Sequence, residues 1–167
     1  AAEALIPIYR AAKDYKRLAG ALQVQADETP DPEVRLDRLR ALAEVYEQNL
    51  SDRKAAFSQF AAALDVDWRP EWIREGAERL AKESGSFREL AVAYEKAATT
   101  ATGSDVLPLL KVLASTYEEH LGEVEAATRT NCQILDIEAD DMAALDARER
   151  LFTLGVAYAD LIRILER

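Results

Sequence analysis

Few residues of this chain could carry out chemistry, and their spacing is not catalytic. The only histidine is His120, which directly follows Glu118 and Glu119. A catalytic histidine needs a nucleophile and an orienting carboxylate beside it, and no such set is recognisable here. We predict that His120 lies in the last turn of a helix, where a positive charge interacts favourably with the helix dipole. We therefore expect a structural role for it.

The only cysteine, Cys132, stands in a predicted helix close to Ile134 and Leu135. No histidine or basic cluster that could activate a thiol stands near it, so we expect a small core residue and not a nucleophile. One cysteine cannot form an internal disulfide, so the fold does not depend on an oxidising compartment. The sequence does not determine the cellular compartment of the protein, and we slightly favour the cytoplasm.

Alternating carboxylates from Asp136 to Asp141 resemble the start of a calcium-binding loop. Such a loop needs glycine at its sixth position and glutamate at its twelfth, where this chain has Asp141 and Ala147. We interpret the stretch as an interhelix loop in which Asp140 or Asp141 caps the next helix. The sequence contains no Gly-rich phosphate loop, Cys-x-x-Cys, His-Glu-x-x-His or Gly-x-Ser-x-Gly motif. We expect no enzyme, cofactor or metal site; an active site built from Asp and Glu alone is the remaining alternative.

The composition favours a helical protein and argues against nucleic-acid binding. The hydrophobic fraction of 49% excludes disorder, and 6 Gly and 5 Pro are too few for the turns of an all-β fold. The net charge of -10 repels phosphate backbones and anionic lipid headgroups. No apolar run reaches the roughly 20 residues of a membrane span. We therefore expect no nucleic-acid partner and no membrane insertion.

The chain matches itself at an offset of 71 residues, with 14 identities among the 49 pairs that begin with Pro32 and end with Leu80. Random pairing of this composition gives on the order of 4 or 5, so duplication is the better explanation. The identical residues include Leu36, Leu39, Leu42, Ala43, Tyr46, Glu47 and Leu50, matched by Leu107, Leu110, Leu113, Ala114, Tyr117, Glu118 and Leu121. A third, partial copy follows.

Apolar residues recur at helical spacing within each copy, and turn residues separate the runs. Predicted tight turns at Lys13, Ser51, Gly85, Gly122 and Gly155 divide each 71-residue unit into two helical hairpins. Asp31 before Pro32 is a helix start, as is the capping box of Ser86 and Glu89. We predict about ten helices, near residues 2–12, 14–27, 32–50, 52–66, 70–84, 86–100, 104–121, 123–137, 140–154 and 156–166. They form five hairpins, near 1–27, 32–66, 70–100, 104–137 and 140–167.

The pattern of Leu113-Ala114, Tyr117, Gly122, Ala127 and Leu135 resembles the tetratricopeptide repeat. Ser51, Ala56 and Gly85 fill equivalent places in neighbouring hairpins. The resemblance implies an all-α, right-handed α-solenoid in which residues 1–167 form a single repeat domain, as a fragment of a longer array. The family's proline after the second helix is missing after Leu135.

The resemblance implies a scaffold for protein–protein interaction, whose concave groove is lined by the first helix of each hairpin. Counted from Leu42 and Leu113 in the family's register, eight residues point into this groove: Arg40, Glu44, Glu47, Arg74, Glu78, Lys111, Ser115 and Glu118. Carboxylates slightly outnumber cations among them. The lysine and asparagine clamp with which some relatives hold a terminal carboxylate is not recognisable, so we expect a basic or mixed-charge partner segment.

The alternative is an architectural spacer or self-assembly segment of a larger repeat protein, without a specific peptide ligand. Apolar residues of the end helices could then pair copies into a homodimer; these are Ile6, Leu161, Ile162 and Leu165. We also predict that at least one of Trp68 and Trp72 seals a junction between hairpins, because Ala139 and Ala143, the equivalents of the two tryptophans, are small.

Overall fold

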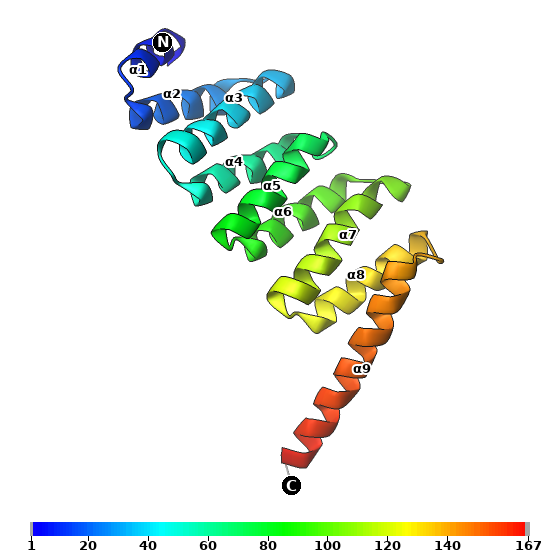
Figure 1. The fold of residues 1–167 in the computed structure, drawn as a ribbon. Coiled ribbons are helices and arrows are strands. Elements are labelled where there is room, and N and C mark those ends of the chain that lie inside the picture. Colours follow the sequence, from blue (N-terminus) through cyan, green and yellow to red (C-terminus); the bar gives the residue numbers. More distant parts are fainter. Residues whose placement is uncertain (1, 166–167) are drawn as a thin grey trace. The chain divides into compact units, whose positions relative to one another are not determined.

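The computed structural model describes the backbone of residues 2–165 and the side chains of residues 4–155. Every regular element in this part of the chain is helical (Figure 1). The elements are α1 (Ala2–Ala11), α2 (Tyr15–Glu28), α3 (Pro32–Glu44), η1 (Val45–Asn49), α4 (Arg53–Val66), α5 (Glu71–Ser84), α6 (Phe87–Thr100), η2 (Gly103–Val106), α7 (Leu107–Ser115), η3 (Thr116–Leu121), α8 (Val124–Ile137) and α9 (Met142–Leu165). The all-α prediction is confirmed, with nine α-helices over the described residues.

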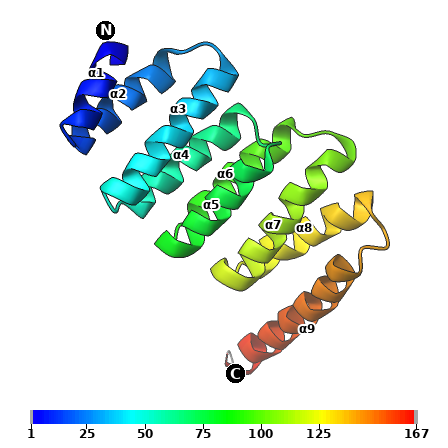
Figure 2. The ribbon, with the colours of Figure 1, turned by 45° about the horizontal axis from the view of Figure 1, so that its top comes forward.

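Helices pack against their neighbours in the sequence. The chain divides into two compact units, residues 1–93 and 94–167, with the boundary inside α6. In the first unit α1 contacts α2, α2 contacts α3, α3 contacts α4 and α4 contacts α5; in the second, α7 contacts α8 and α8 contacts α9 (Figure 2). Sequential packing is consistent with a helical repeat, whereas the solenoid stays a prediction.

Four of the five predicted tight turns have the left-handed backbone that ends a helix. The φ angles are 54° at Lys13 and Ser51, 72° at Gly85 and 64° at Gly122. Glycine adopts this conformation at little steric cost, and the two non-glycine residues accept it at a modest cost. The turn spacing read from the sequence is therefore correct at these positions.

The fifth predicted turn, at Gly155, is wrong. One continuous helix, α9, covers the two helices predicted at 140–154 and 156–166. The 71-residue offset aligns Gly85 with Val156 and not with Gly155. A β-branched residue strongly disfavours a positive φ, so the chain continues as a helix where the first copy turns back. A glycine inside a helix costs only about 1 kcal/mol and does not break it.

Both copies of the repeat end their first helix in a π-helical segment. These segments are η1 and η3, whose first residues, Val45 and Thr116, are 71 positions apart. The amide of Leu50 donates to the carbonyl of Val45, five residues back. The helix predicted at 32–50 is therefore α-helical first and wider at its end. The helix predicted at 104–121 begins in the 3₁₀ segment η2, continues as α7 and ends in the wider η3. Tyr117, a residue of the family pattern, lies in this wider turn.

Side-chain caps fix the helix starts as predicted. The Asp31 carboxylate accepts hydrogen bonds from the amides of Glu33 and Val34 at the start of α3. Asp141 accepts one from Ala144 at the start of α9. Such caps satisfy amides that have no partner inside the helix and contribute about 1 kcal/mol each. The interpretation of residues 136–141 as an interhelix loop with an aspartate cap is confirmed.

Cys132 is exposed on α8, so its predicted place in the core is wrong. The buried face of α8 instead carries Ala127, Asn131 and Ile134. These residues follow the three-and-four spacing of one helix face, and Cys132 lies a further 100° around the helix from Asn131. The buried Asn131 amide donates to the carbonyl of Ala127, which satisfies it. A polar side chain occupies the place where an apolar one was expected.

The end helices partly match their predicted exposure. Ile6 was predicted to be exposed, but it is half-buried, because it packs on the cluster of Leu18, Leu22 and Leu42. Leu161, Ile162 and Leu165 lie outside the residues whose side chains are described. The exposed apolar side chains on the described part of α9 include Phe152, at 73% exposure, and Leu154.

A glycine allows α4 and α5 to approach closely. A Cβ atom added to Gly76 of α5 would lie 2.2 Å from Cε1 of Phe60 on α4. Phe60 is itself buried and packs edge-on against Trp72, with ring centroids 6.0 Å apart. The ring cannot move away without losing that contact. Gly76 is thus required by packing and not by backbone conformation.

We predict that Gly76→Ala lowers the free energy of unfolding by up to about 2 kcal/mol. Overpacking costs about 1–3 kcal/mol, and the higher helix propensity of alanine returns about 1 kcal/mol. The matched control is Gly20→Ala on α2, where a Cβ meets nothing within 4 Å. Chemical denaturation should show that variant unchanged or stabilised. Equal effects of the two substitutions would contradict the close packing of α4 on α5.

Candidate functional site

Glu47, a predicted binding residue on η1, is joined to Arg79 of α5. The guanidinium donates two parallel hydrogen bonds to the carboxylate, at 2.6 and 2.9 Å. Arg79 also contacts Glu83 at 3.1 Å, and Arg53 of α4 contacts Glu83 at 3.0 Å. This network lowers the pKa of the Glu47 carboxyl, first through the hydrogen bond from Arg79, and raises the pKa of Arg79. Glu47 therefore connects consecutive first helices.

The second copy repeats this connection. Glu118 of η3 accepts hydrogen bonds from Nε and Nη2 of Arg150 on α9, at 3.2 and 3.0 Å. Glu47 and Glu118 are equivalent at the 71-residue offset, and so are Arg79 and Arg150. The duplicated identities in the sequence thus include a contact pair, which the sequence could not show because its members are 32 residues apart.

Arg40 and Trp72 make the next contact on the same face. The Arg40 guanidinium lies 5.0 Å from the centroid of the Trp72 ring, in cation–π geometry. Its Nε lies 3.8 Å from the carboxylate of Glu44, one turn further along α3. Trp72 of α5 also packs against Phe60 of α4. The prediction that a tryptophan seals a junction between hairpins is confirmed.

Lys111 of α7 stands where the first copy has Arg40, and it has acidic partners instead of an aromatic one. Its Nζ lies 2.6 Å from Asp141 and 3.4 Å from Glu138, at the start of α9 and just before it. The hydrogen bond to Asp141, followed by that to Glu138, raises the pKa of Lys111. The same bond lowers the pKa of Asp141. Lys111 is half-exposed despite these contacts.

The remaining predicted residues lie on the same helices. Arg74 donates hydrogen bonds to the carbonyls of Trp68 and Arg69, at 3.0 and 2.6 Å, and so fixes the loop before α5. Ser115 is exposed on α7 and donates to the carbonyl of Val112. Glu78 is half-buried on α5. Whether these residues bind a partner stays a prediction.

A hollow of about 210 Å³ lies between α7, η3, α8 and α9; we call it the α7–α9 hollow. It brings together three predicted binding residues, Lys111, Ser115 and Glu118, with Asp141 and Arg150. Its lining also includes four small residues, Ala114, Ala143, Ala144 and Ala147. The lining of the hollow thus combines charged side chains with alanine methyl groups.

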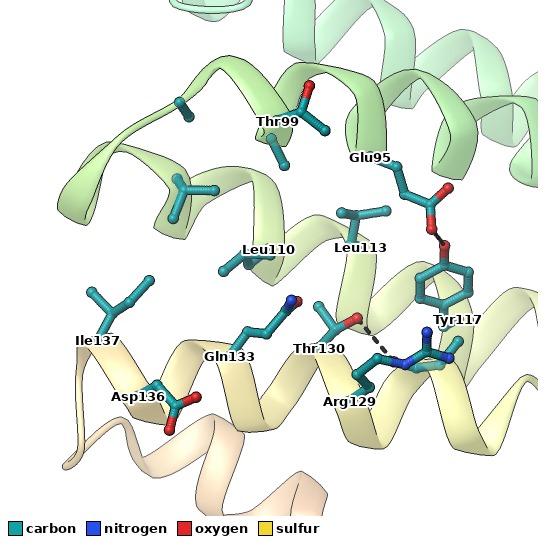
Figure 3. A pocket seen from close by; sticks show the side chains of 14 residues that line it. Glu95, Thr99, Leu110, Leu113, Tyr117, Arg129, Thr130, Gln133, Asp136 and Ile137 are labelled. Atoms are coloured by element: carbon teal, nitrogen blue, oxygen red, sulfur yellow. Dashed lines mark hydrogen bonds between the residues drawn. The ribbon is translucent and has the colours of Figure 1, made fainter.

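A larger cleft of about 560 Å³ opens on the other side of α7, between the second half of α6 and α8; we call it the α6–α8 cleft (Figure 3). Leu110, Leu113 and Ile137 are among its apolar lining residues. The Tyr117 hydroxyl donates to Glu95 at 2.5 Å across one end of it. Burial, followed by this contact with Glu95, raises the pKa of the Tyr117 hydroxyl.

Sequence reasoning missed the α6–α8 cleft. Tyr117 was recognised only as part of the repeat pattern, and Glu95 was not singled out. The two residues come from different hairpins, and nothing in their local sequence indicates that they meet. Tyr46 of the first copy matches Tyr117 at the offset of 71 residues. Glu95 has no acidic equivalent, because the first copy has Gln23 at the matching position, where the offset is 72 residues. This acidic partner therefore belongs to the second copy alone.

No group of three or more His, Cys, Asp or Glu side chains in the described part of the chain could hold a metal ion. None of the helices described is long and apolar enough to cross a membrane. His120 lies in the last turn of η3, as predicted, and its side chain is exposed.

None of the protein-family models, curated proteins and solved structures compared with this chain matches it. The chain is therefore described by its own fold, an all-helical arrangement with sequential packing, and no family is identified. The tetratricopeptide resemblance rests on the residues named above.

We predict that Glu47→Gln lowers the free energy of unfolding by about 0.5–1 kcal/mol at neutral pH, since the Arg79 pair is partly exposed. The pKa of Glu47 is lowered in the folded state, so its contribution is present above the pKa of the unfolded chain and is lost as the pH falls through the folded value. Denaturation curves should therefore converge below about pH 4, near the reference pKa of glutamate. Glu28→Gln, at the exposed end of α2, is the control. A constant difference at every pH would contradict the pair.

Proposed function

We propose that the helical hairpins are tetratricopeptide-like, stack as a right-handed α-solenoid and act as a protein–protein interaction scaffold. A segment of a partner protein binds along the first helices. The observation that carries this proposal is the α7–α9 hollow, which collects Lys111, Ser115 and Glu118 at one place. Its volume of 210 Å³ lies below the roughly 300–1,000 Å³ of small-molecule sites and fits a single side chain of a larger partner.

The charges of the hollow favour a basic or mixed-charge segment. Its lining includes the cations Lys111 and Arg150 and the carboxylates Glu118, Glu119 and Asp141. Carboxylates are in excess, as they are in the whole chain. Because the cations already have acidic partners, an acidic segment would have to displace them. A partner with one or two lysines or arginines beside its anchoring residue meets complementary charge.

The second candidate is self-assembly through α9, as a homodimer or as a spacer in a larger repeat protein. The observation that favours it is the exposure of Phe152, at 73%, and of Leu154, at 45%. An exposed aromatic ring on a helix offers apolar area that a second copy of the chain could bury. Self-assembly through α9 would leave the α7–α9 hollow without a partner segment.

We predict that Ser115→Arg weakens partner binding at least tenfold, because a long charged side chain at the rim blocks entry to the hollow. Ser58→Arg on α4 is the matched control, since both serines are exposed and each donates to a carbonyl of its own helix. A partner isolated with the 167-residue chain is titrated against both variants by calorimetry. Equal affinity of the two variants for that partner would reject the first-helix face as the binding surface.

For self-assembly, we predict that sedimentation equilibrium shows a dimer of the 167-residue chain that Phe152→Ser dissociates. Removing the exposed ring takes away apolar area that the contact would bury. Ile8→Ser on α1, another exposed apolar residue, is the control and should leave the dimer intact. A monomer at high micromolar concentration, or a dimer that Phe152→Ser does not affect, would reject self-association through α9.

A further inference from the structure

The first copy of the repeat contains a filled version of the α7–α9 hollow. Subtracting 71 from the number of each lining residue gives a set in the first unit that includes Trp72 and the two residues shown in contact with it, Arg40 and Phe60. Ala114 corresponds to Ala43, and both are buried. Glu118 and Arg150 correspond to Glu47 and Arg79, and both pairs are hydrogen-bonded. The two places therefore share the buried alanine and the Glu–Arg pair.

The centres of the two places differ. Where the first unit has Trp72 and Phe60, the second has Ala143 and Asn131. In the first unit the two rings pack edge-on, at a centroid distance of 6.0 Å. Replacing both rings by small side chains removes that filling. The 210 Å³ of the hollow is the space that remains between the walls.

Gly76 of the first copy also differs from its equivalent in the second copy, in step with the loss of the Phe60 ring. Gly76 leaves room for the Phe60 ring, and its equivalent in the second copy is Ala147, which faces the smaller Asn131 position. The second copy therefore has the methyl group of Ala147 at a place where the first copy has glycine and the Phe60 ring. Asn131 turns its amide to the carbonyl of Ala127 on its own helix. Among the alanines that line the hollow, Ala144 and Ala147 are buried, whereas Ala143 is exposed.

The cation above this space is retained. Arg40 lies over the face of Trp72 at 5.0 Å, and Lys111 occupies the equivalent position in the second copy. Lysine and arginine both bind aromatic faces through the ring quadrupole. Asp141 and Glu138 hold the Lys111 ammonium near the hollow and leave the side chain half-exposed. An aromatic ring above Ala143 would therefore meet a positioned cation.

We propose that the α7–α9 hollow is a binding site for one aromatic side chain of indole size, presented by a partner protein. The partner's ring takes the place that Trp72 occupies in the first unit, with Lys111 in the role of Arg40. This inference rests on the proposed function, since it names the anchoring residue of the partner segment. A tryptophan anchor also agrees with the prominence of this residue at the centre of protein interfaces.

The charge of the hollow favours a neutral ring over an anion. Three of its lining residues are carboxylates and two are cations, and each of the two cations is already paired. An aliphatic side chain could fill the volume, but it would gain nothing from the Lys111 ammonium. The preference for an aromatic over an aliphatic group is the measurable signature of the site.

The test uses N-acetyltryptophanamide as a neutral indole probe on the 167-residue chain with labelled alanine methyl groups. We expect methyl NMR shifts at Ala143, Ala144 and Ala147 with a dissociation constant in the millimolar range. N-acetylleucinamide should bind at least threefold more weakly, and Lys111→Met should reduce indole affinity at least threefold. Absence of shifts at these alanines up to the solubility limit of the probe, or equal binding of both probes, would overturn the proposal.

Ala143→Trp fills the hollow from within and should abolish the indole shifts at Ala144 and Ala147. Its melting temperature should equal or exceed that of the unmodified chain, because the first unit carries the same ring. Ala139→Trp, which imitates Trp68 beside the hollow, is the matched control and should keep the shifts. Indole shifts that persist in Ala143→Trp would overturn the proposal, and the probe titrations above decide the matter if this variant does not fold.

The two proposals can fail separately. If a partner's binding is weakened by Ser115→Arg but is unaffected by N-acetyltryptophanamide or by Ala143→Trp, the aromatic site is wrong and the scaffold stands. If the probe binds at these alanines and no partner depends on the first-helix face, the site stands and the scaffold proposal is wrong.

Discussion

Each helix of this chain is amphipathic and can bury its apolar face only against the helices before and after it. In the first unit Leu18 and Leu22 of α2 meet Leu42 of α3, and in the second unit α8 likewise packs between α7 and α9. Burying one leucine side chain contributes about 1.5–3 kcal/mol, more than any exposed ion pair here. The positions of all other groups, including the charged ones, follow from this sequential packing.

Ion pairs contribute less to the free energy of folding than apolar burial does, but they determine the charge of the surface that a partner would contact. Glu47 with Arg79 and Glu118 with Arg150 connect first helices at equivalent positions of the two copies. Residues that the sequence presents as free charges are thus already engaged within the chain. A partner would meet a face of paired charges, where shape and the few unfilled places decide what fits.

The duplication explains why the second unit has the α7–α9 hollow at a place where the first unit has the rings of Phe60 and Trp72. Copies of a repeat must keep the contacts that stack their helices, so the buried positions and the Glu–Arg pairs are shared. Residues between the first helices are less constrained, and there the ring pair of Phe60 and Trp72 gives way to Asn131 and Ala143. The glycine-to-alanine change at Gly76 and Ala147 accompanies the loss of the ring, because the space it served is no longer needed.

The sequence by itself determined the helical class, four of the five turns and the aspartate caps, because helical spacing, left-handed turn residues and N-caps act within a few positions. Through the register of the repeat it also grouped Lys111, Ser115 and Glu118, which line one hollow in the structure. Only the tertiary structure decided that α9 continues past Gly155, that Cys132 faces solvent while Asn131 is buried, and that Glu118 pairs with Arg150. These outcomes depend on contacts between residues about 30 positions apart or on small differences between competing backbone conformations. Local sequence carries neither kind of information.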